Sequence, residues 1–268
     1  MTSLLGHPNS RAELIGYSFA AADQTSASAP QQRHGFYPYT DNGGTTLGIS
    51  GPDFALLAGD TRSTHGYSIN TRYEPKIFRI GADDESGEKG HLLLAVVGYA
   101  ADGHALKERL DAAVKMYKYR HGKQMSITAA AKRLSTMLYS KRFFPYYVST
   151  MIAGIDEEGR GALYSYDPVG SYEREFCRSA GAASSLVTPF LDNQVNAKNQ
   201  YEPLKEGQDR LEQEAKRPEP LSREVALQLV HDAFDSAAER HIEVGDGLQT
   251  FVITREGIEE IYVPLKKD

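Results

Sequence analysis

A glycine–threonine junction, followed by an acidic and a basic residue, is the part of this sequence best suited to chemistry. Thr45 and Thr46 follow Gly44, and Asp60 and Lys76 come further along the chain. A threonine whose own amine is freed by cleavage can serve as nucleophile and as part of the base system. A cationic lysine beside the hydroxyl lowers the cost of forming an alkoxide. These residue types indicate peptide-bond cleavage, provided that a threonine occupies the position next to the lysine.

Three stretches carry a family resemblance: 42–49, Asp60-Thr61-Arg62 and 73–76. They resemble the beta-type subunits of the proteasome core particle. In active members, the resemblance implies, cleavage after a glycine frees the nucleophilic threonine, with an Asp sixteen and a Lys thirty-two residues further on. Counted back from Asp60 and from Lys76, both distances reach Gly44. A glycine has no side-chain oxygen, so the resemblance predicts that no acyl-enzyme forms.

The alternative is an active threonine endopeptidase that uses Thr45 or Thr46. The segment 45–49 reads as a strand, in which successive side chains point to opposite faces. Thr45 then points away from the face that the lysine approaches. Thr46 points the right way but lies roughly 6.6 Å further along the strand. The strand pattern therefore argues against either threonine as the nucleophile.

The supporting positions of the family also differ here. Active relatives carry an Arg-Asp-x-x-Ser-Gly-type segment, and the matching stretch, 240–245, has His241 in place of the Asp and Val244 in place of the Ser. The resemblance places the family's other supporting serine at Ala180. Asp60, Lys76 and Arg62 remain. We therefore predict a degenerate, non-catalytic site, and no cofactor or metal site, since the eight histidines show no metal-ligand spacing.

The resemblance covers residues 35–268 and becomes more specific in 141–147, 166–175 and 189–195. These stretches resemble the non-catalytic subunit at the sixth place of the beta ring. The resemblance implies a structural subunit that helps to form the chamber for ubiquitin-dependent degradation. It implies other alpha and beta subunits as partners in a stacked four-ring hetero-oligomer, and assembly chaperones. It also implies a location in cytoplasm and nucleus.

Two segments differ from the rest of the chain. Residues 1–34 lack any helical or strand period, and the resemblance implies a prosegment cut near His34-Gly35. The alternative is an N-terminal segment that is never cut. Residues 201–221 are rich in charge and proline and predict an exposed insertion, either a surface loop or a contact for an assembly partner.

Composition sets broad limits. A length of 268 residues with 40% hydrophobic residues suits one large domain with a substantial core. The formal net charge of −6 argues against a nucleic-acid-binding surface. No apolar run is long enough to predict a membrane span. Cys177 is the single cysteine, so no intrachain disulfide is possible, and its surroundings favour a packing role.

The order of the expected elements predicts the fold class. Strands are expected at 45–49, 54–59, 77–80 and 91–98, then helices that begin at Asp102 and Ser126. Further strands are expected at 147–155, 162–166 and 173–177, followed by a helix at 182–187 that Pro189 ends or kinks. A long helix from Ser222 and strands at 249–254 and 259–263 close the chain. The pattern predicts a layered α+β fold. The resemblance adds the four-layer αββα sandwich of N-terminal-nucleophile hydrolases.

Overall fold

The computed structural model describes residues 37–83, 88–204, 209 and 213–268. The chain divides into two units, Met1–Thr40 and Asp41–Asp268, and every helix and strand given below belongs to the second. In the first unit, the rings of Tyr37 and Tyr39 meet edge to face. The predicted prosegment 1–34 and its cleavage site at His34-Gly35 lie outside the described residues.

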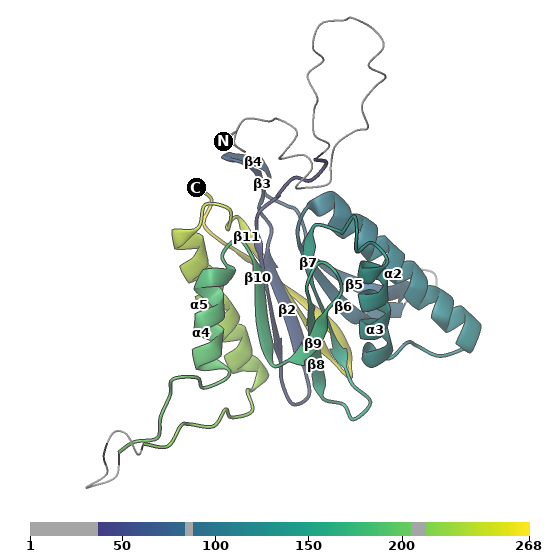
Figure 1. Ribbon diagram of the computed structural model, residues 1–268. Helices are drawn as coiled ribbons and strands as arrows, with labels where there is room; N and C mark the ends of the chain where they lie inside the picture. The colour runs from purple at the N-terminus through teal and green to yellow at the C-terminus, as the bar shows by residue number, and fades with distance from the viewer. Residues whose placement is uncertain (1–36, 84–87, 205–208, 210–212) are drawn as a thin grey trace, which may run out of the picture. The chain divides into compact units, whose positions relative to one another are not determined.

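The second unit contains two five-stranded antiparallel sheets (Figure 1). The first sheet has the order β10-β1-β2-β11-β12. Its strands are β1 (Thr45–Ser50), β2 (Ala55–Asp60), β10 (Cys177–Gly181), β11 (Gly247–Thr254) and β12 (Gly257–Pro264). The second sheet has the order β5-β6-β7-β8-β9. Its strands are β5 (Ile77–Asp83), β6 (Glu88–Gly98), β7 (Val148–Ile155), β8 (Gly161–Tyr166) and β9 (Tyr172–Glu175).

A pair of helices covers the outer face of each sheet (Figure 1). Helices α2 (Ala100–His121) and α3 (Ile127–Tyr139) pack on the second sheet, and α4 (Ser184–Gln194) and α5 (Arg223–Arg240) pack on the first. The hydroxyls of Ser126 and Ser222 cap α3 and α5, because each accepts a backbone N–H three residues further on. The resulting order, helices–sheet–sheet–helices, is the four-layer α+β sandwich.

Three apolar clusters hold these layers together. One lies between the first sheet and α4 and α5, and includes Leu56 and Phe234. Another lies between the second sheet and α2 and α3, and includes Leu94. The third lies between the sheets and includes Leu57 and Leu163. The strands in the middle of each sheet are buried on both faces, which explains why 92–97 reads as an unbroken apolar run.

Several local expectations were wrong. Asp102 does not cap α2, which begins at Ala100. Its carboxylate accepts the N–H of Tyr147 instead. Of the two alternatives for Pro189, an end to the helix was wrong, because α4 continues to Gln194, with Val187 and Leu191 buried against the sheet. The short ribbon of β3 (Ser63–His65) and β4 (Ser68–Thr71) was missed, since its strands have too few residues to show a period.

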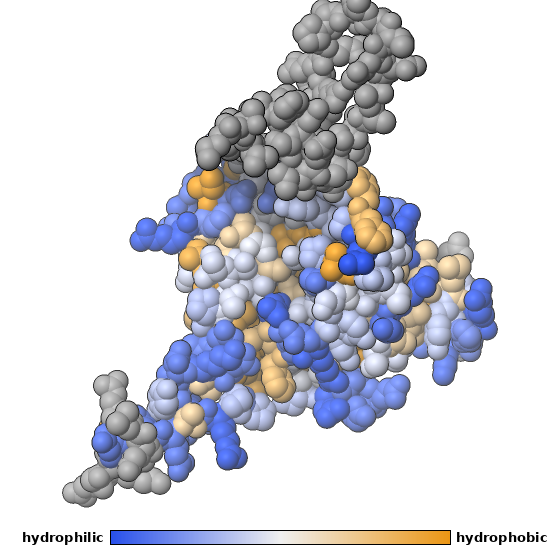
Figure 2. All heavy atoms as spheres, in the orientation of Figure 1, coloured by the Kyte–Doolittle hydropathy of each residue, from blue (hydrophilic) through white to orange (hydrophobic). Residues whose placement is uncertain are grey.

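The described parts of the predicted insertion, 201–204 and 213–221, lie below α4 and α5 in Figure 1. Tyr201 bridges to Ala215, and Glu202 N–H donates to the carbonyl of Glu214. Nearly all of its described residues are exposed, and Figure 2 shows hydrophilic side chains along it. Among the described residues, no helix has the length and hydropathy needed to cross a bilayer.

Replacement of Phe234 tests the contribution of the outer cluster to stability. Phe234 is fully buried on α5, so Phe234→Ala should lower the free energy of unfolding by about 3–5 kcal/mol, through lost burial and the cavity left behind. Val225→Ala on the same helix, at a side chain 49% exposed, should stay within about 0.5 kcal/mol. Urea unfolding of the full-length chain measures both. Equal losses would contradict the packing described here.

Candidate functional site

Gly44 lies directly before β1 and faces Lys76 and Asp60. Its φ is +79°, in the left-handed region that favours glycine. A Cβ at this position would lie 2.6 Å from Lys76 Nζ and 3.0 Å from Asp60 Oδ1. The structure thus brings together the three residues that spacing had aligned, and any side chain at position 44 would point at the lysine.

Oxygen atoms of Asp60 and Arg62 surround the ammonium group of Lys76. Nζ donates to the backbone carbonyls of Asp60 at 2.8 Å and Arg62 at 2.7 Å. It also lies 3.4 Å from Asp60 Oδ1. Backbone carbonyls therefore take two of the three N–H donors of the ammonium, and the Asp60 carboxylate lies beside it as an ion-pair partner. The side chain is buried and lies in the space that a side chain at position 44 would need.

Asp60, at the end of β2, is buried and holds the start of β1. Its Oδ1 accepts the N–H of Thr45 at 2.7 Å, and Oδ2 accepts that of Gly245 at 3.4 Å. Burial raises the pKa of this carboxyl, while the charge of Lys76 and the two backbone amides oppose the rise. The lysine and the amides therefore offset part of the cost of ionising a buried acid.

Neither neighbouring threonine presents its hydroxyl to Lys76. Thr45 Oγ1 accepts the N–H of Ala183 at 2.9 Å, at the start of α4. Thr46 Oγ1 is buried and has no hydrogen-bond partner among the described residues. Since the three oxygens around Lys76 Nζ come from Asp60 and Arg62, the lysine is not arranged to activate either hydroxyl.

Ala180 lies on β10, the strand beside β1, and pairs with Thr46 in the β1–β10 ladder. The next two residues lie against Gly44. Ala182 N–H donates to the Gly44 carbonyl at 2.8 Å, and a Cβ at Gly181 would lie 2.4 Å from the same oxygen. Ala180, Gly181 and Ala182 all lack a side-chain hydroxyl.

His241 and Val244 lie in the loop after α5. The ring Nδ1 of His241 accepts the N–H of Glu243 at 3.3 Å, and Val244 is buried in the apolar cluster beside α5. This loop reaches the site through two residues that the sequence reasoning missed. Gly245 donates to Asp60, and the Glu243 side chain lies against Gly43.

The chain just before Gly44 is bound between β3 and the end of β6. Asn42 N–H donates to Gly98 O at 3.0 Å, and Asn42 O accepts the N–H of Thr64 at 2.9 Å. The side-chain Oδ1 of Asn42 accepts the N–H of Ala100 at 2.9 Å. Asn42 thus bridges two strands beside the site and ties down the segment that would have to be removed to free an amine at position 44. No sequence motif indicated this role.

Comparison with known proteins decides the family. The profile of the proteasome subunit family matches residues 40–206. The chain belongs to the proteasome subunit family. "Proteasome subunit beta inpE" of Emericella nidulans is 58% identical over 234 residues, which cover 87% of this chain and 97% of the relative. "Proteasome subunit beta type-6" of Saccharomyces cerevisiae is 51% identical over 253 residues, 94% and 99% of the two chains. "Proteasome subunit beta type-1" of Danio rerio is 44% identical, over 88% and 90%.

A buried arginine holds the far side of the site in this proteasome subunit. Arg62 Nε donates to Asp246 Oδ2 at 2.8 Å, and further guanidinium N–H groups reach the carbonyls of Ile242 and Lys266. Burial alone would raise the pKa of Asp246, but hydrogen bonds from Arg62 and Arg72 hold it below its usual value. Arg62, retained from the family pattern, therefore joins β2 to the loop after α5 and to the end of the chain.

The single thiol of this subunit is placed for packing. Cys177 is buried in β10, and burial, with the nearby carboxylates of Asp192 and Glu175, raises its pKa to about 11. The thiolate is the nucleophilic form of cysteine. Cys177 is therefore not an alternative nucleophile.

Substitution of Gly44 tests how tightly the site has closed around the missing side chain. Gly44→Ala should lose roughly 1–2 kcal/mol of stability from the left-handed backbone and about 1–3 kcal/mol more from displacing the buried ammonium of Lys76. Gly66→Ala is the matched control, because Gly66 has a φ of +59° but open space around its Cβ position. Urea unfolding gives both values. Equal losses of stability in the two variants would show that the Lys76 side chain moves aside without a cost in free energy.

Alkylation kinetics test the state of Cys177. With a pKa of about 11, only about one thiol in a thousand is ionised at pH 8, so iodoacetamide should react very slowly with the native chain. In urea the thiol returns to its ordinary pKa of about 8.5 and should react at least tenfold faster. Mass spectrometry follows the single adduct. Equally fast labelling of the native chain would contradict the buried placement.

Proposed function

We propose that this chain is a non-catalytic, structural beta subunit of the proteasome core. The observation that carries the proposal is the orientation of Gly44 toward Lys76 and Asp60. The position that a nucleophile would need in this site has no side-chain oxygen. The neighbouring groups have other partners, because Lys76 donates to the backbone carbonyls of Asp60 and Arg62, and the hydroxyl of Thr45 accepts the N–H of Ala183.

The bound segment before Gly44 supports the same proposal. A threonine peptidase of this kind needs a free N-terminal amine beside its hydroxyl. The backbone of Asn42 is tied to Gly98 and Thr64, so the chain runs past position 44 through ordered hydrogen bonds. We infer that trimming by a neighbouring subunit stops upstream of Asp41, in keeping with a cut near His34-Gly35.

The work of such a subunit is geometric. In this proposal, the chain takes a place in the beta ring of a stacked four-ring hetero-oligomer, beside other alpha and beta subunits. It helps to enclose the chamber in which other subunits cut proteins marked by ubiquitin, in cytoplasm and nucleus. Assembly chaperones would guide it into the ring. A ring of different subunits needs two unlike faces on each chain.

Exposed aromatic residues after α3 are candidates for one of these faces. Phe143 is 88% exposed, and Phe144 and Tyr147 are also accessible. Tyr146, in contrast, is buried, and its hydroxyl accepts a hydrogen bond from Arg109. Aromatic residues are enriched at the centres of interfaces, so we propose that Phe143 and its exposed neighbours contact an adjacent subunit.

The intact mass of the chain in its native complex tests the proposal. The complex is first treated with a peptide electrophile that forms adducts with N-terminal threonines. We expect a chain that begins near Gly35 and carries no adduct, while adducts on other subunits serve as the positive control. A chain that begins at Thr45 or Thr46, or one that carries the adduct, would establish the alternative of an active threonine endopeptidase.

A further inference from the structure

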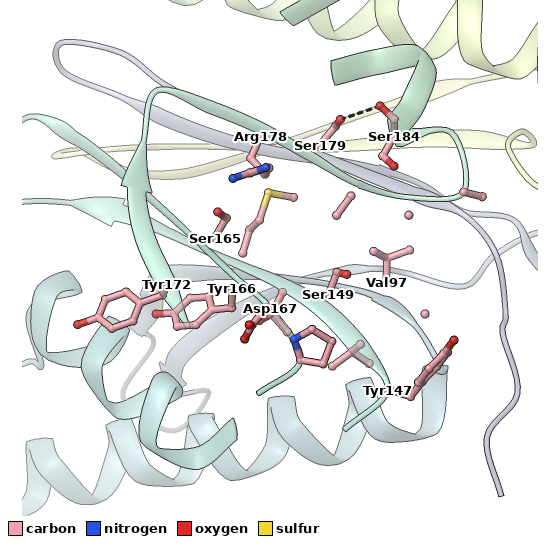
Figure 3. Close-up of a pocket in the computed structure, with 18 of the residues that line it drawn as sticks. Val97, Tyr147, Ser149, Ser165, Tyr166, Asp167, Tyr172, Arg178, Ser179 and Ser184 are labelled. Atoms are coloured by element: carbon pink, nitrogen blue, oxygen red, sulfur yellow. Dashed lines mark hydrogen bonds between the residues drawn. The ribbon is translucent and has the colours of Figure 1, made fainter. Parts of the chain in front are cut away.

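Two cavities lie at opposite ends of β1. Figure 3 shows the cavity at the end beside Gly44, about 780 Å³ in volume, with Ser179 on one wall and Ser165 on the other. A second cavity, of about 560 Å³, lies at the other end, where β1 finishes at Ser50. Its volume falls within the range of about 300–1,000 Å³ that is usual for ligand sites. The two cavities share no lining residue, so the second is separate from the site around Gly44.

Backbone hydrogen bonds between distant segments hold three walls of the second cavity. Gly161 N–H, at the start of β8, donates to the Gly51 carbonyl at 3.1 Å, and Ser50 N–H donates to the Phe176 carbonyl at 2.8 Å. The turns after β1 and β7 and the crossing between the sheets are therefore in place before any ligand binds. The fourth wall is the last part of the insertion, 218–221.

Much of the lining of the second cavity is apolar. The side chain of Phe176 is 69% exposed, although its neighbour in the cavity, Val195, is buried. Pro52, Pro218, Pro220 and Leu221 complete the apolar surface. Covering the exposed part of an aromatic ring is favourable, and prolines lose almost no side-chain freedom when a ligand packs on them. The cavity therefore suits a ligand with an apolar body.

Two arginines supply the polar part of the lining. Arg174 Nη2 donates to Asp156 at 2.8 Å and to the Gly161 carbonyl at 3.1 Å. Arg160 donates to the same carboxylate at 3.2 Å and to Glu158 at 3.0 Å. Burial alone would raise the pKa of Asp156, but hydrogen bonds from Arg174 and the Arg160 backbone, with the charges of both arginines, lower it to about 2. The ionised carboxylate thus positions both guanidinium groups.

Several donors of these arginines are available to a ligand. A guanidinium carries five N–H groups. Within the described part of the chain, no group accepts from Arg174 Nε or Nη1, or from Arg160 Nη1. Of the two lining carboxylates, Glu175 is bound by Arg178 at 2.7 Å, whereas Glu219 is exposed and has no described partner. The free groups therefore favour a ligand with a single carboxylate that lies at the arginine side, away from Glu219.

We propose that the second cavity binds a small aromatic carboxylate. Its ring packs against Phe176 and the prolines of the insertion, and its carboxylate accepts N–H groups from Arg160 and Arg174. Hydrogen bonds between a guanidinium and a carboxylate are among the strongest that proteins make. Since the walls belong to both sheets and to the insertion, the ligand also holds the insertion against the domain. This binding involves no residue near Gly44 and does not depend on the proposed function.

Photolabelling of the native complex with 4-benzoylbenzoate tests the proposal. The probe is an aromatic carboxylate whose ketone inserts into nearby C–H bonds on irradiation. We expect labelling of peptides that contain Phe176 or 218–221, with saturation at roughly 0.1–1 mM for a ligand of this size. An excess of biphenyl-4-carboxylate should abolish it. Label spread evenly over the exposed surface of the subunit, or none in the cavity, would overturn the proposal.

The neutral analogue 4-methylbenzophenone tests the role of the carboxylate. It has the same two rings but cannot accept hydrogen bonds from the arginines through a carboxylate. Its labelling of the cavity should be about threefold to tenfold weaker, as expected for the loss of a charge-assisted hydrogen bond at a partly exposed site. Equally strong labelling by both probes would show that the arginines do not select the ligand, and the proposal would be wrong.

Two variants at exposed side chains locate the ligand. Arg160→Gln removes a donor at a side chain 61% exposed, and Phe176→Ala removes the aromatic wall. Each should lower labelling of 218–221 about threefold to tenfold. Arg120→Gln and Tyr119→Ala, at exposed positions of α2 outside the cavity, are the matched controls and should leave labelling unchanged. Equal effects of the cavity variants and the controls would contradict the placement.

Glu219→Gln tests the side of the cavity at which the carboxylate lies. It removes an exposed negative charge from the lining, so labelling by 4-benzoylbenzoate should stay the same or increase. A clear loss of labelling would show that the ligand needs Glu219 and that the assignment of the arginines is wrong. Peptide cleavage is not part of any of these measurements, so the proposed function and the ligand site can fail independently.

Discussion

The buried contact between Lys76 and the end of β2 holds together the residues around Gly44. The ammonium binds two backbone carbonyls and approaches the Asp60 carboxylate, in a site from which solvent is largely excluded. A buried charge left without partners is costly, so these contacts must be kept once the lysine lies there. They join the start of the second sheet to the first sheet. The glycine at position 44 leaves room for this arrangement.

Other contacts follow from the same constraint. Because Asp60 also accepts the N–H groups of Thr45 and Gly245, it positions the start of β1 and the loop after α5. Arg62, two residues further on, binds that loop from the other side through Asp246. Asn42 then holds the chain that enters the site. Asp60, Lys76, Arg62 and Asn42 therefore act as structural links between the layers of the fold.

The two sheets account for both the rigid and the open parts of the fold. Where they face each other closely, Leu57 and Leu163 fill the space between them. The chain crosses from the edge of one sheet to the edge of the other through Phe176. A cavity lined by residues of both β9 and β10 opens between the sheets and reaches Gly43. The residues around Gly44 and this cavity are therefore adjacent features of one architecture.

Local sequence patterns were sufficient for much of the fold. Apolar runs bounded by turn residues identified the principal strands, and Ser126 and Ser222 marked the starts of two helices, because these signals arise between near neighbours. Family spacing identified Gly44, Asp60 and Lys76 as one group. It could not show which residues of β10 pair beside Gly44, since strand register depends on pairing between distant segments. The hydrogen bonds of Asn42 and the Arg62–Asp246 ion pair likewise form only after the sheets have packed, because each joins groups far apart in the sequence. The unpaired edge of β10 is also set by which distant strands pair.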